Sequence, residues 1–198
     1  MPAVRLFLGL GNPGSRYRAT RHNLGQEVIR LVCRRRGLRL KRKGAARVGS
    51  LEGGGGRFLL ATPLGYMNES GGAALELAGV LRCAPEEILV LVDDTAIPLG
   101  RIRIRSGGSD GGHRGLRSVL QALGTDAVPR LRMGILGEEP PGDVVRFVLE
   151  PFLREERPAV DRMVSVAADC VEWILERGLG SAMNEFNRRN RLPTEGEG

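Results

Sequence analysis

The residues best suited to catalysis are the two histidines of the chain, His22 and His113. Both stand in stretches rich in glycine and asparagine rather than on an apolar face. An unperturbed imidazole changes charge close to neutral pH, so a histidine in a loop is a suitable general base. A solvated surface histidine is the competing interpretation, and polar groups beside the ring decide between the two.

Asp93 is the candidate partner of His22. It follows the apolar run at 88–92, which predicts a buried strand, and His22 comes after a similar run at 4–10. The carboxyl ends of parallel strands meet at one edge of an α/β sheet, so the two side chains are expected there together. A carboxylate that accepts the proton of one ring nitrogen fixes the tautomer and keeps the other nitrogen basic. A helix cap or a surface carboxylate is the alternative for Asp93.

Asn12 and Asn68 follow strands that should end at the same edge. No serine or cysteine stands in a G-x-S-x-G nucleophile motif, so a histidine base here indicates an activated water molecule. Side-chain amides and backbone N–H groups can then hold a carbonyl and stabilise its oxyanion. This chemistry suits an ester better than an amide, because an alkoxide leaves with less help from an acid. Each asparagine taken alone is more often a turn or capping residue.

Short apolar runs separated by helical spacing predict an α/β fold with a largely parallel sheet. The glycine-rich loop at 107–115 joins the catalytic edge if the alternating strand at 101–105 runs in the same direction as its neighbours. Buried strands are expected at 4–10, 57–62 and 88–92, a hairpin between 45–52 and 57–62, and helices at 113–123, 158–176 and 180–188.

The length of 198 residues suits one domain, expected over residues 1–192, followed by a disordered polar tail at 193–198. No run approaches the roughly 20 apolar residues that span a bilayer, and the N-terminus lacks a secretion signal. A cytoplasmic protein without membrane association is therefore expected. The three cysteines are far apart, which favours buried reduced thiols over a disulfide framework or a zinc site.

The chain carries a net charge of +7, and Lys41 and Lys43 are its only lysines among 30 basic residues. Such an excess of arginine favours a polyanionic partner, although a coding bias towards arginine is an alternative. Alternation at 101–105 places three arginines on one strand face at intervals of roughly 6.5 Å, close to the spacing of phosphates along a nucleic-acid strand. Arg130 and Arg132 repeat the alternation on an expected neighbouring strand. A solvated basic sheet face is the competing interpretation.

Gly9, Gly11 and Gly14 form a G-x-G-x-x-G motif after the first strand, the pattern of dinucleotide-binding proteins. Three features argue against a nucleotide-dependent reductase. Pro13 removes a backbone N–H from the turn, and helical spacing starts only near Asn23, so no helix N-terminus points at a phosphate there. The second strand and acidic residue of a dinucleotide-binding unit are also missing.

Several motifs, in order along the chain, resemble the bacterial-type peptidyl-tRNA hydrolases. The resemblance runs from about residue 4 to residue 188. The matching stretches are Gly9–Gly14, Thr20–Gly25, Tyr66–Gly71, Ile88–Gly100, Gly107–Leu116, Arg130–Gly134 and Ala182–Asn187.

The resemblance implies a monomer with a single-domain three-layer α/β/α sandwich around a mixed sheet. It also implies hydrolysis, without metal or cofactor, of the ester that joins a peptide to the 3′ ribose of tRNA. Such a reaction recycles tRNA from peptidyl-tRNA that ribosomes release prematurely. By position in the motifs, His22 would be the general base, Asp93 would orient it, and Asn12 would help distinguish N-blocked from free aminoacyl-tRNA. Residues expected to bind substrate or tRNA are Tyr17, Tyr66, Asn68, Arg114, Arg105 and Arg132, the last two as a clamp on the 5′-phosphate.

Three positions depart from the family pattern. Ala96 replaces an acidic residue, Leu136 replaces a glycine, and Arg114 replaces an asparagine that helps position substrate and water. Arg114 is expected either to bind a phosphate or to weaken turnover. With the basic face, Arg114 and Ala96 motivate an alternative: a non-catalytic RNA-binding relative, similar to the chloroplast splicing factors that resemble this family.

Overall fold

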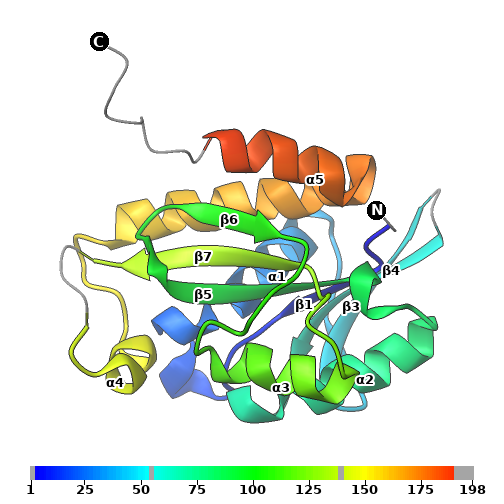
Figure 1. Ribbon diagram of the computed structural model, residues 1–198, viewed down its shortest axis with the longest axis horizontal. Helices are drawn as coiled ribbons and strands as arrows, with labels where there is room; N and C mark the ends of the chain where they lie inside the picture. Colours follow the sequence, from blue (N-terminus) through cyan, green and yellow to red (C-terminus); the bar gives the residue numbers. More distant parts are fainter. Residues whose placement is uncertain (1–2, 54–55, 138–140, 190–198) are drawn as a thin grey trace.

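One mixed sheet organises the part of the chain that the structure, a computed structural model, describes: residues 3–53, 56–137 and 141–189 (Figure 1). Within these residues seven strands are arranged in the order β2-β3-β4-β1-β5-β7-β6. Their bounds are β1 Leu6–Gly9, β2 Lys41–Lys43, β3 Ala46–Gly53, β4 Gly56–Pro63, β5 Ile88–Pro98, β6 Ile102–Arg105 and β7 Arg130–Leu136.

The central strands β4, β1, β5 and β7 run parallel to one another. The outer strands are antiparallel: β3 pairs with β4, β2 with β3, and β6 with β7. The expected hairpin and the expected mixed sheet are both confirmed. Because the four central strands share a direction, their carboxyl ends meet at one edge, and the loops that follow them converge there.

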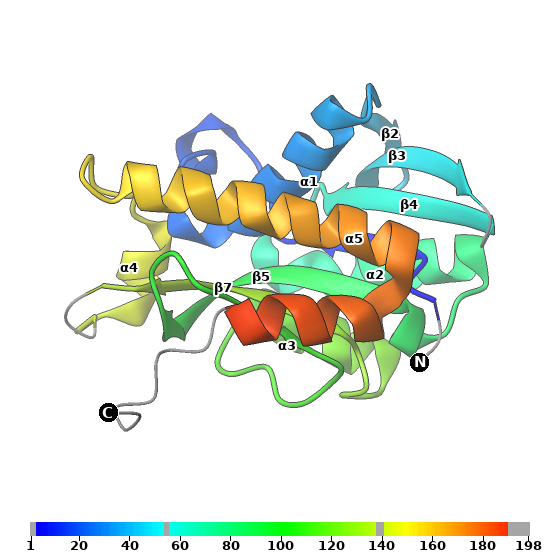
Figure 2. The same cartoon turned by 90° about the horizontal axis from the view of Figure 1, so that it is seen from above.

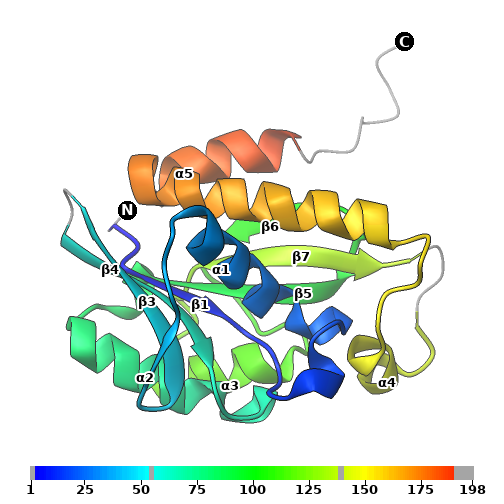
Figure 3. The ribbon, with the colours of Figure 1, turned by 180° about the vertical axis from the view of Figure 1, so that it is seen from behind.

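Helices cover both faces of this sheet, as Figures 1 and 3 show from opposite sides. Helices α1 and α5 pack on one face, and α2 and α3 pack on the other. The three-layer α/β/α arrangement is therefore as expected. The helix bounds are α1 Leu24–Arg35, α2 Ser70–Leu81, α3 Arg114–Leu123, α4 Val144–Leu149 and α5 Arg157–Arg189, and single 3-10 turns lie at η1 Ser15–Tyr17, η2 Arg21–Asn23, η3 Met67–Glu69 and η4 Pro85–Glu87.

Two apolar cores lie on the two faces of the sheet. Successive residues of a strand point to opposite faces, so Phe7 belongs to the core under α1 and α5, whereas Leu6 and Leu8 belong to the core under α2 and α3. All three side chains are fully buried. Burial on both faces explains why the central strands read as continuous apolar runs.

Helix α5 is interrupted at Gly178, where the backbone adopts φ 79° and ψ 166°. A positive φ of this kind is accessible to glycine at little cost. The chain turns there, and the last part of α5 runs back beside the first, as seen from above in Figure 2. The separate helices expected at 158–176 and 180–188 correspond to the two sides of this break.

Strand β6 does not meet the condition set for the glycine-rich loop, because it runs antiparallel to β7 and so opposite to the central strands. Arg105, at the end of β6, lies level with the start of β7. The loop at 106–113 then carries the chain back towards the carboxyl edge, held by a 3.0 Å hydrogen bond from the Gly108 N–H to the Asp126 carbonyl.

Other sequence expectations have mixed outcomes. Cys33 and Cys170 are buried free thiols, and burial raises the pKa of Cys33 to about 11, but Cys83 is only half-buried.

The sequence did not predict the short elements β2 and α4. The tail expected at 193–198 lies outside the described residues. Among the described residues, no helix is long and apolar enough to cross a membrane.

Candidate active site

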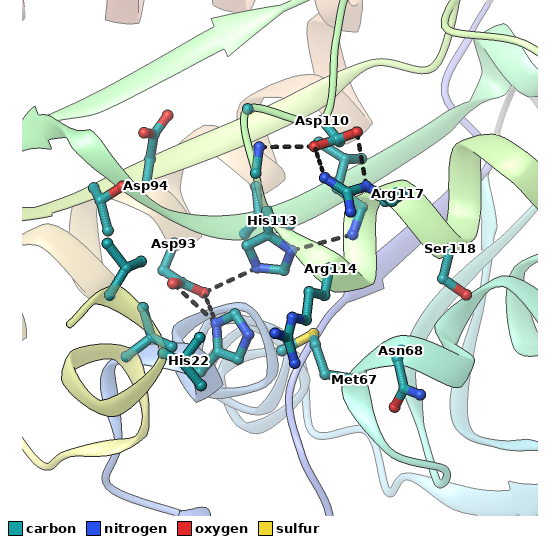
Figure 4. A pocket seen from close by; sticks show the side chains of 18 of the residues that line it. His22, Met67, Asn68, Asp93, Asp94, Asp110, His113, Arg114, Arg117 and Ser118 are labelled. Atoms are coloured by element: carbon teal, nitrogen blue, oxygen red, sulfur yellow. Dashed lines mark hydrogen bonds and ion pairs between the residues drawn. The ribbon is translucent and has the colours of Figure 1, made fainter.

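A cavity of about 770 Å³ opens at the carboxyl edge of the central strands (Figure 4). The loops after β1 and β4 and residues 92–95 within β5 line it, and α3 and α4 contribute walls. The structure brings most of the expected site residues together here and leaves Arg105 outside. The expected residues that line the cavity are Asn12, Tyr17, His22, Tyr66, Asn68, Asp93, Arg114 and Arg132.

His22 and Asp93 form a buried pair at the floor of this cavity. Nδ1 of His22 lies 2.9 Å from Oδ1 and 3.0 Å from Oδ2 of Asp93. The short turn η2 holds His22 between β1 and α1, and the continuation of β5 holds Asp93 opposite it. A carboxylate can only accept, so Nδ1 carries the proton and donates. Nε2 of His22 is then left unprotonated and able to accept a proton.

His113 contacts the same carboxylate, as the dashed lines in Figure 4 mark. Its Nε2 lies 3.1 Å from Oδ1 of Asp93, and its Nδ1 accepts a 3.1 Å hydrogen bond from the Leu116 N–H at the start of α3. The Leu116 bond assigns the proton of His113 to Nε2, which therefore donates to Asp93. Sequence analysis singled out His113 but gave it no role. The feature of the sequence that pointed to His113 was its position in a glycine-rich loop.

Asp93 is almost completely buried, with 4% of its surface exposed. Burial alone would raise its pKa, but the charges and hydrogen bonds of His22 and His113 outweigh burial and hold the pKa well below its ordinary value. The carboxyl group is therefore ionised at neutral pH. The ligand atoms of these three residues lie within 4.8 Å of one another, so the donor set is one that could accept a metal ion. The hydrogen bonds above already account for the arrangement.

Asn12 lies beside the pair, with its orientation fixed by hydrogen bonds. Its Oδ1 accepts from the Met67 N–H at 2.9 Å, and its backbone exchanges two hydrogen bonds with the Asn23 side chain, at 2.8 and 3.0 Å. Because Oδ1 already accepts this hydrogen bond, the Nδ2 group is the part of the Asn12 amide that can donate to a ligand.

The glycines of the G-x-G-x-x-G motif have a packing role. A Cβ atom at Gly9 would lie 2.2 Å from the carbonyl oxygen of Gly25, and one at Gly11 would lie 2.8 Å from the Gln26 side chain. These glycines let the loop after β1 approach the first turn of α1. Close approach positions Asn12 and His22, which explains Gly9 and Gly11 without a bound nucleotide. Gly14, the third glycine of the motif, meets no such contact and instead adopts a positive φ of 94°.

Helix α4 forms an apolar wall of the cavity and is tied to the residue before His22. Val144 and Val145 line the cavity and are about half exposed, at 48% and 47%. Arg21 anchors the segment after them: its guanidinium lies over the Phe147 ring at 4.2 Å and pairs with Glu156 at 2.7 Å. Sequence analysis did not identify α4 or the role of Arg21.

The outer part of the cavity carries positive charge and exposed polar groups. Arg114 is exposed at the start of α3, and in Figure 4 its side chain extends towards the side of the cavity where His22 and Met67 lie. Tyr66 and Asn68, which also line the cavity, are exposed. An arginine here places a cation within the substrate cavity itself.

Arg132 is ion-paired with Asp94 at the edge of the cavity. On the paired strands, Arg103 lies opposite Arg132, and Arg105 lies opposite Arg130. Arg103 and Arg105 are exposed, whereas Arg130 is buried. The alternating arginines thus form a basic strip along β6 and β7, which reaches the cavity at Arg132.

Within the described residues, no serine or cysteine lies within hydrogen-bond distance of His22. Ser118, which lines the cavity, instead accepts a 3.0 Å hydrogen bond from the Gly71 N–H. A three-layer α/β fold with a histidine–carboxylate pair in an open cavity defines an enzyme-like site of the hydrolase type. The model of the family described as Peptidyl-tRNA hydrolase matches residues 6–194, and the chain belongs to this family.

Relatives and solved structures agree with this assignment. The peptidyl-tRNA hydrolase of Moorella thermoacetica is 45% identical over 190 residues, covering 94% of this chain and 100% of the relative. That of Mycobacterium tuberculosis is 44% identical over 186 residues, covering 92% and 96%. The crystal structure of peptidyl-tRNA hydrolase from Acinetobacter baumannii is 32% identical, superposes with a TM-score of 0.84, and covers 93% of this chain and 94% of that one.

Proposed function

We propose that this protein hydrolyses the ester between a peptide, or an N-blocked aminoacyl group, and the 3′ ribose of tRNA, with His22 as the general base. Family membership supports the reaction. The observation that supports the catalytic role is the pairing of His22 Nδ1 with Asp93, which leaves Nε2 as the basic nitrogen beside the cavity. The product would be a free tRNA, recycled from peptidyl-tRNA that left the ribosome early.

The reaction would proceed by attack of water. Nε2 of His22 removes a proton from the water as its oxygen bonds to the ester carbonyl carbon, and the carbonyl oxygen becomes negative. Nδ2 of Asn12 donates to that oxygen, and Asn68 is a second donor across the cavity. Asp93 stabilises the imidazolium that forms. When the tetrahedral intermediate collapses, His22 returns the proton to the 3′ oxygen of the ribose.

His113 acts in this scheme as a positioning residue. Its hydrogen bond to Oδ1 restrains the Asp93 carboxylate that contacts His22, and the Leu116 N–H holds His113 in turn. Because His113 and His22 both donate to Oδ1, the negative charge of Asp93 faces both imidazole rings. A fixed Asp93 favours one tautomer of His22 throughout the cycle.

Substrate recognition would divide between the parts of the cavity rim. Arg114 and Arg132 on the rim, together with Arg105 outside the cavity on β6, suit the phosphates of tRNA, because the guanidinium group forms bidentate hydrogen bonds with phosphate oxygens. Tyr17, Tyr66 and Asn68, which line the cavity, would contact the aminoacyl and ribose region. The apolar wall of α4 suits the side chains of the peptide. We also expect the protein to act as a monomer in the cytoplasm, which light scattering and fractionation would test.

The decisive assay compares N-acetyl-aminoacyl-tRNA with free aminoacyl-tRNA as substrates of the wild-type protein. We expect turnover of the blocked substrate and at most slow turnover of the free one. The intact His22–Asp93 pair favours this outcome over a non-catalytic RNA-binding protein. Binding of tRNA without turnover of either substrate would instead support the RNA-binding alternative that Arg114 and Ala96 suggested.

A further inference from the structure

A second groove, of about 640 Å³, lies behind the floor of the catalytic cavity. It is bounded by the loop after β1, by α1 and by the hairpin of β3 and β4. Asn12 lines both the groove and the catalytic cavity, so the two spaces adjoin at this residue. The wall is rigid, because the hydrogen bonds between Asn12 and Asn23 hold it on the groove side.

Three arginines from three different elements line this groove. Arg18 follows η1, Arg30 lies on α1, and Arg47 lies on β3. Within the described part of the chain none of them has a carboxylate within 4.0 Å, and no acidic residue lines the groove. Arg30 instead contacts an uncharged group, because its Nη2 donates a 2.5 Å hydrogen bond to Oε1 of Gln26.

Two arginines at the end of α1, Arg35 in its last turn and Arg36 directly after it, show how carboxylates neutralise arginines elsewhere in this fold. Arg35 pairs with Asp169 at 2.7 Å, and Arg36 pairs with Glu172 and Glu176 at 3.3 and 3.1 Å. These two arginines face α5, which carries the carboxylates that pair with them. On the groove side of the same helix Arg30 has no such partner.

Like charges that the fold brings together repel each other, and the cost grows as water is excluded. Arg30 is half-buried, and burial lowers its pKa, with a further lowering from the charge of Arg18 and, more weakly, of Arg47, while Glu27 opposes the effect. An anion placed among the three guanidinium groups would relieve this repulsion. Thr62, opposite Arg47 in the sheet, adds a hydroxyl to the lining.

We propose that Arg18, Arg30 and Arg47 form a phosphate-binding site in this groove, separate from the catalytic cavity and from the basic strip on β6 and β7. Planar guanidinium groups on three sides suit the several oxygens of one phosphate. The wall shared with the catalytic cavity favours a phosphodiester of the bound tRNA as the source of that phosphate. This choice of source rests on the proposed function, whereas the phosphate site itself does not.

The test uses the double variant Arg18→Gln/Arg47→Gln, which removes two exposed charges and leaves the half-buried Arg30 in place. The matched control is Arg154→Gln/Arg162→Gln, because these arginines are exposed, lie outside both cavities and have no ion pair among the described residues. Deacylated tRNA binding is measured by fluorescence anisotropy over a salt series. Pyrophosphate binding is measured by calorimetry.

We expect the groove variant to bind tRNA about tenfold more weakly at low salt. The slope of log affinity against log salt concentration should also become shallower by roughly 1.4, which corresponds to two lost phosphate contacts on a single strand. The control variant should change the affinity less than about twofold. Hydrolysis of a minimal N-acetyl-aminoacyl ester of adenosine should be unchanged in both variants, which shows that the catalytic cavity is intact.

Each outcome has one meaning. Specific loss of tRNA affinity supports the site and identifies tRNA as the source of the phosphate. Loss of pyrophosphate affinity with unchanged tRNA affinity supports the site and identifies a free phosphate compound instead. Equal losses in the two double variants, or no loss of either ligand, would overturn the proposal. Absence of hydrolysis by the wild-type protein would contradict the proposed function and leave the phosphate site standing.

Discussion

The rings of His22 and His113 lie with their centroids 4.6 Å apart, because both donate a hydrogen bond to the same oxygen of Asp93. One carboxylate therefore orients two imidazoles. A proton on Nδ1 of His22 and one on Nε2 of His113 satisfy this geometry with both rings neutral. The arrangement leaves a single basic nitrogen beside the cavity, Nε2 of His22. When His22 becomes protonated, the negative charge of Asp93 stabilises the imidazolium that forms.

Substitution of Asp93 tests the role of that carboxylate. Asp93→Asn keeps the size of the side chain but removes the charge and presents an amide donor to one of the rings, which favours the wrong tautomer of His22. We expect kcat to fall by about 10³- to 10⁴-fold, as for other histidine–carboxylate sites. Circular dichroism checks that the fold persists. A decrease of less than tenfold would show that His22 does not depend on Asp93.

The depressed pKa of Asp93 also predicts how stability depends on pH. A group whose folded pKa lies below its unfolded value, about 3.9, stabilises the fold above that value and loses the contribution as the pH falls towards the folded pKa. Wild-type protein should therefore lose more unfolding free energy below about pH 4 than Asp93→Asn does. Urea denaturation between pH 3 and pH 6 measures the difference. Parallel curves for the two proteins would contradict the assignment.

His113 should behave as a positioning residue rather than as a base. We expect His113→Ala to lower kcat by roughly 10- to 100-fold with little change in KM, because the substrate contacts remain while Asp93 loses one hydrogen bond. His113→Gln should recover part of the rate, since its amide can still donate to Oδ1. Equal defects in the two variants would indicate that the imidazole itself takes part in the chemistry.

Arg21 should stabilise the wall formed by α4. Arg21→Met keeps an apolar stem against Phe147 but leaves the Glu156 carboxylate, with 14% of its side chain exposed, without its partner. We expect a loss of about 2–4 kcal/mol in unfolding free energy, measured by urea denaturation. The control is Arg146→Met, whose pair with Glu150 is exposed and should matter far less. Similar losses in both variants would mean that the burial of Arg21 is unimportant.

Arg114 should contribute to tRNA binding as a phosphate contact. Arg114→Asn restores the residue usual in the family and removes one exposed charge from the cavity rim. We expect a several-fold loss of tRNA affinity and a reduction of about 0.7–0.9 in the slope of its salt dependence. Arg162→Gln, an exposed substitution on α5, serves as the control. An unchanged slope in Arg114→Asn would show that the side chain makes no phosphate contact.

The His22–Asp93 pair could be predicted from the sequence because it depends on strand direction in a parallel sheet. The apolar runs before the two residues identify buried strands, and parallel strands end at a common edge. The same argument placed Asn12 and Asn68. The expectation of a mixed sheet between two helical layers was also correct.

The position of His113 could not be predicted in this way. The alternation at 101–105 indicates a strand but not its direction, and β6 runs antiparallel to β7. Only the return of the loop at 106–113 brings His113 to Asp93, through contacts far apart in sequence. The wall at α4 was also beyond prediction, because six residues with exposed valines carry little helical pattern. Its position depends on the long-range contacts of Arg21.

The most direct test of the account is the single-turnover rate at which N-acetyl-aminoacyl-tRNA is hydrolysed by wild-type protein and by His22→Ala. We expect the rate to fall by at least about 10³-fold, since the variant has no group at the position of Nε2 to remove the proton of water. Affinity for tRNA should stay within about twofold of wild type. A variant that retains a tenth or more of the wild-type rate would contradict His22 as the general base.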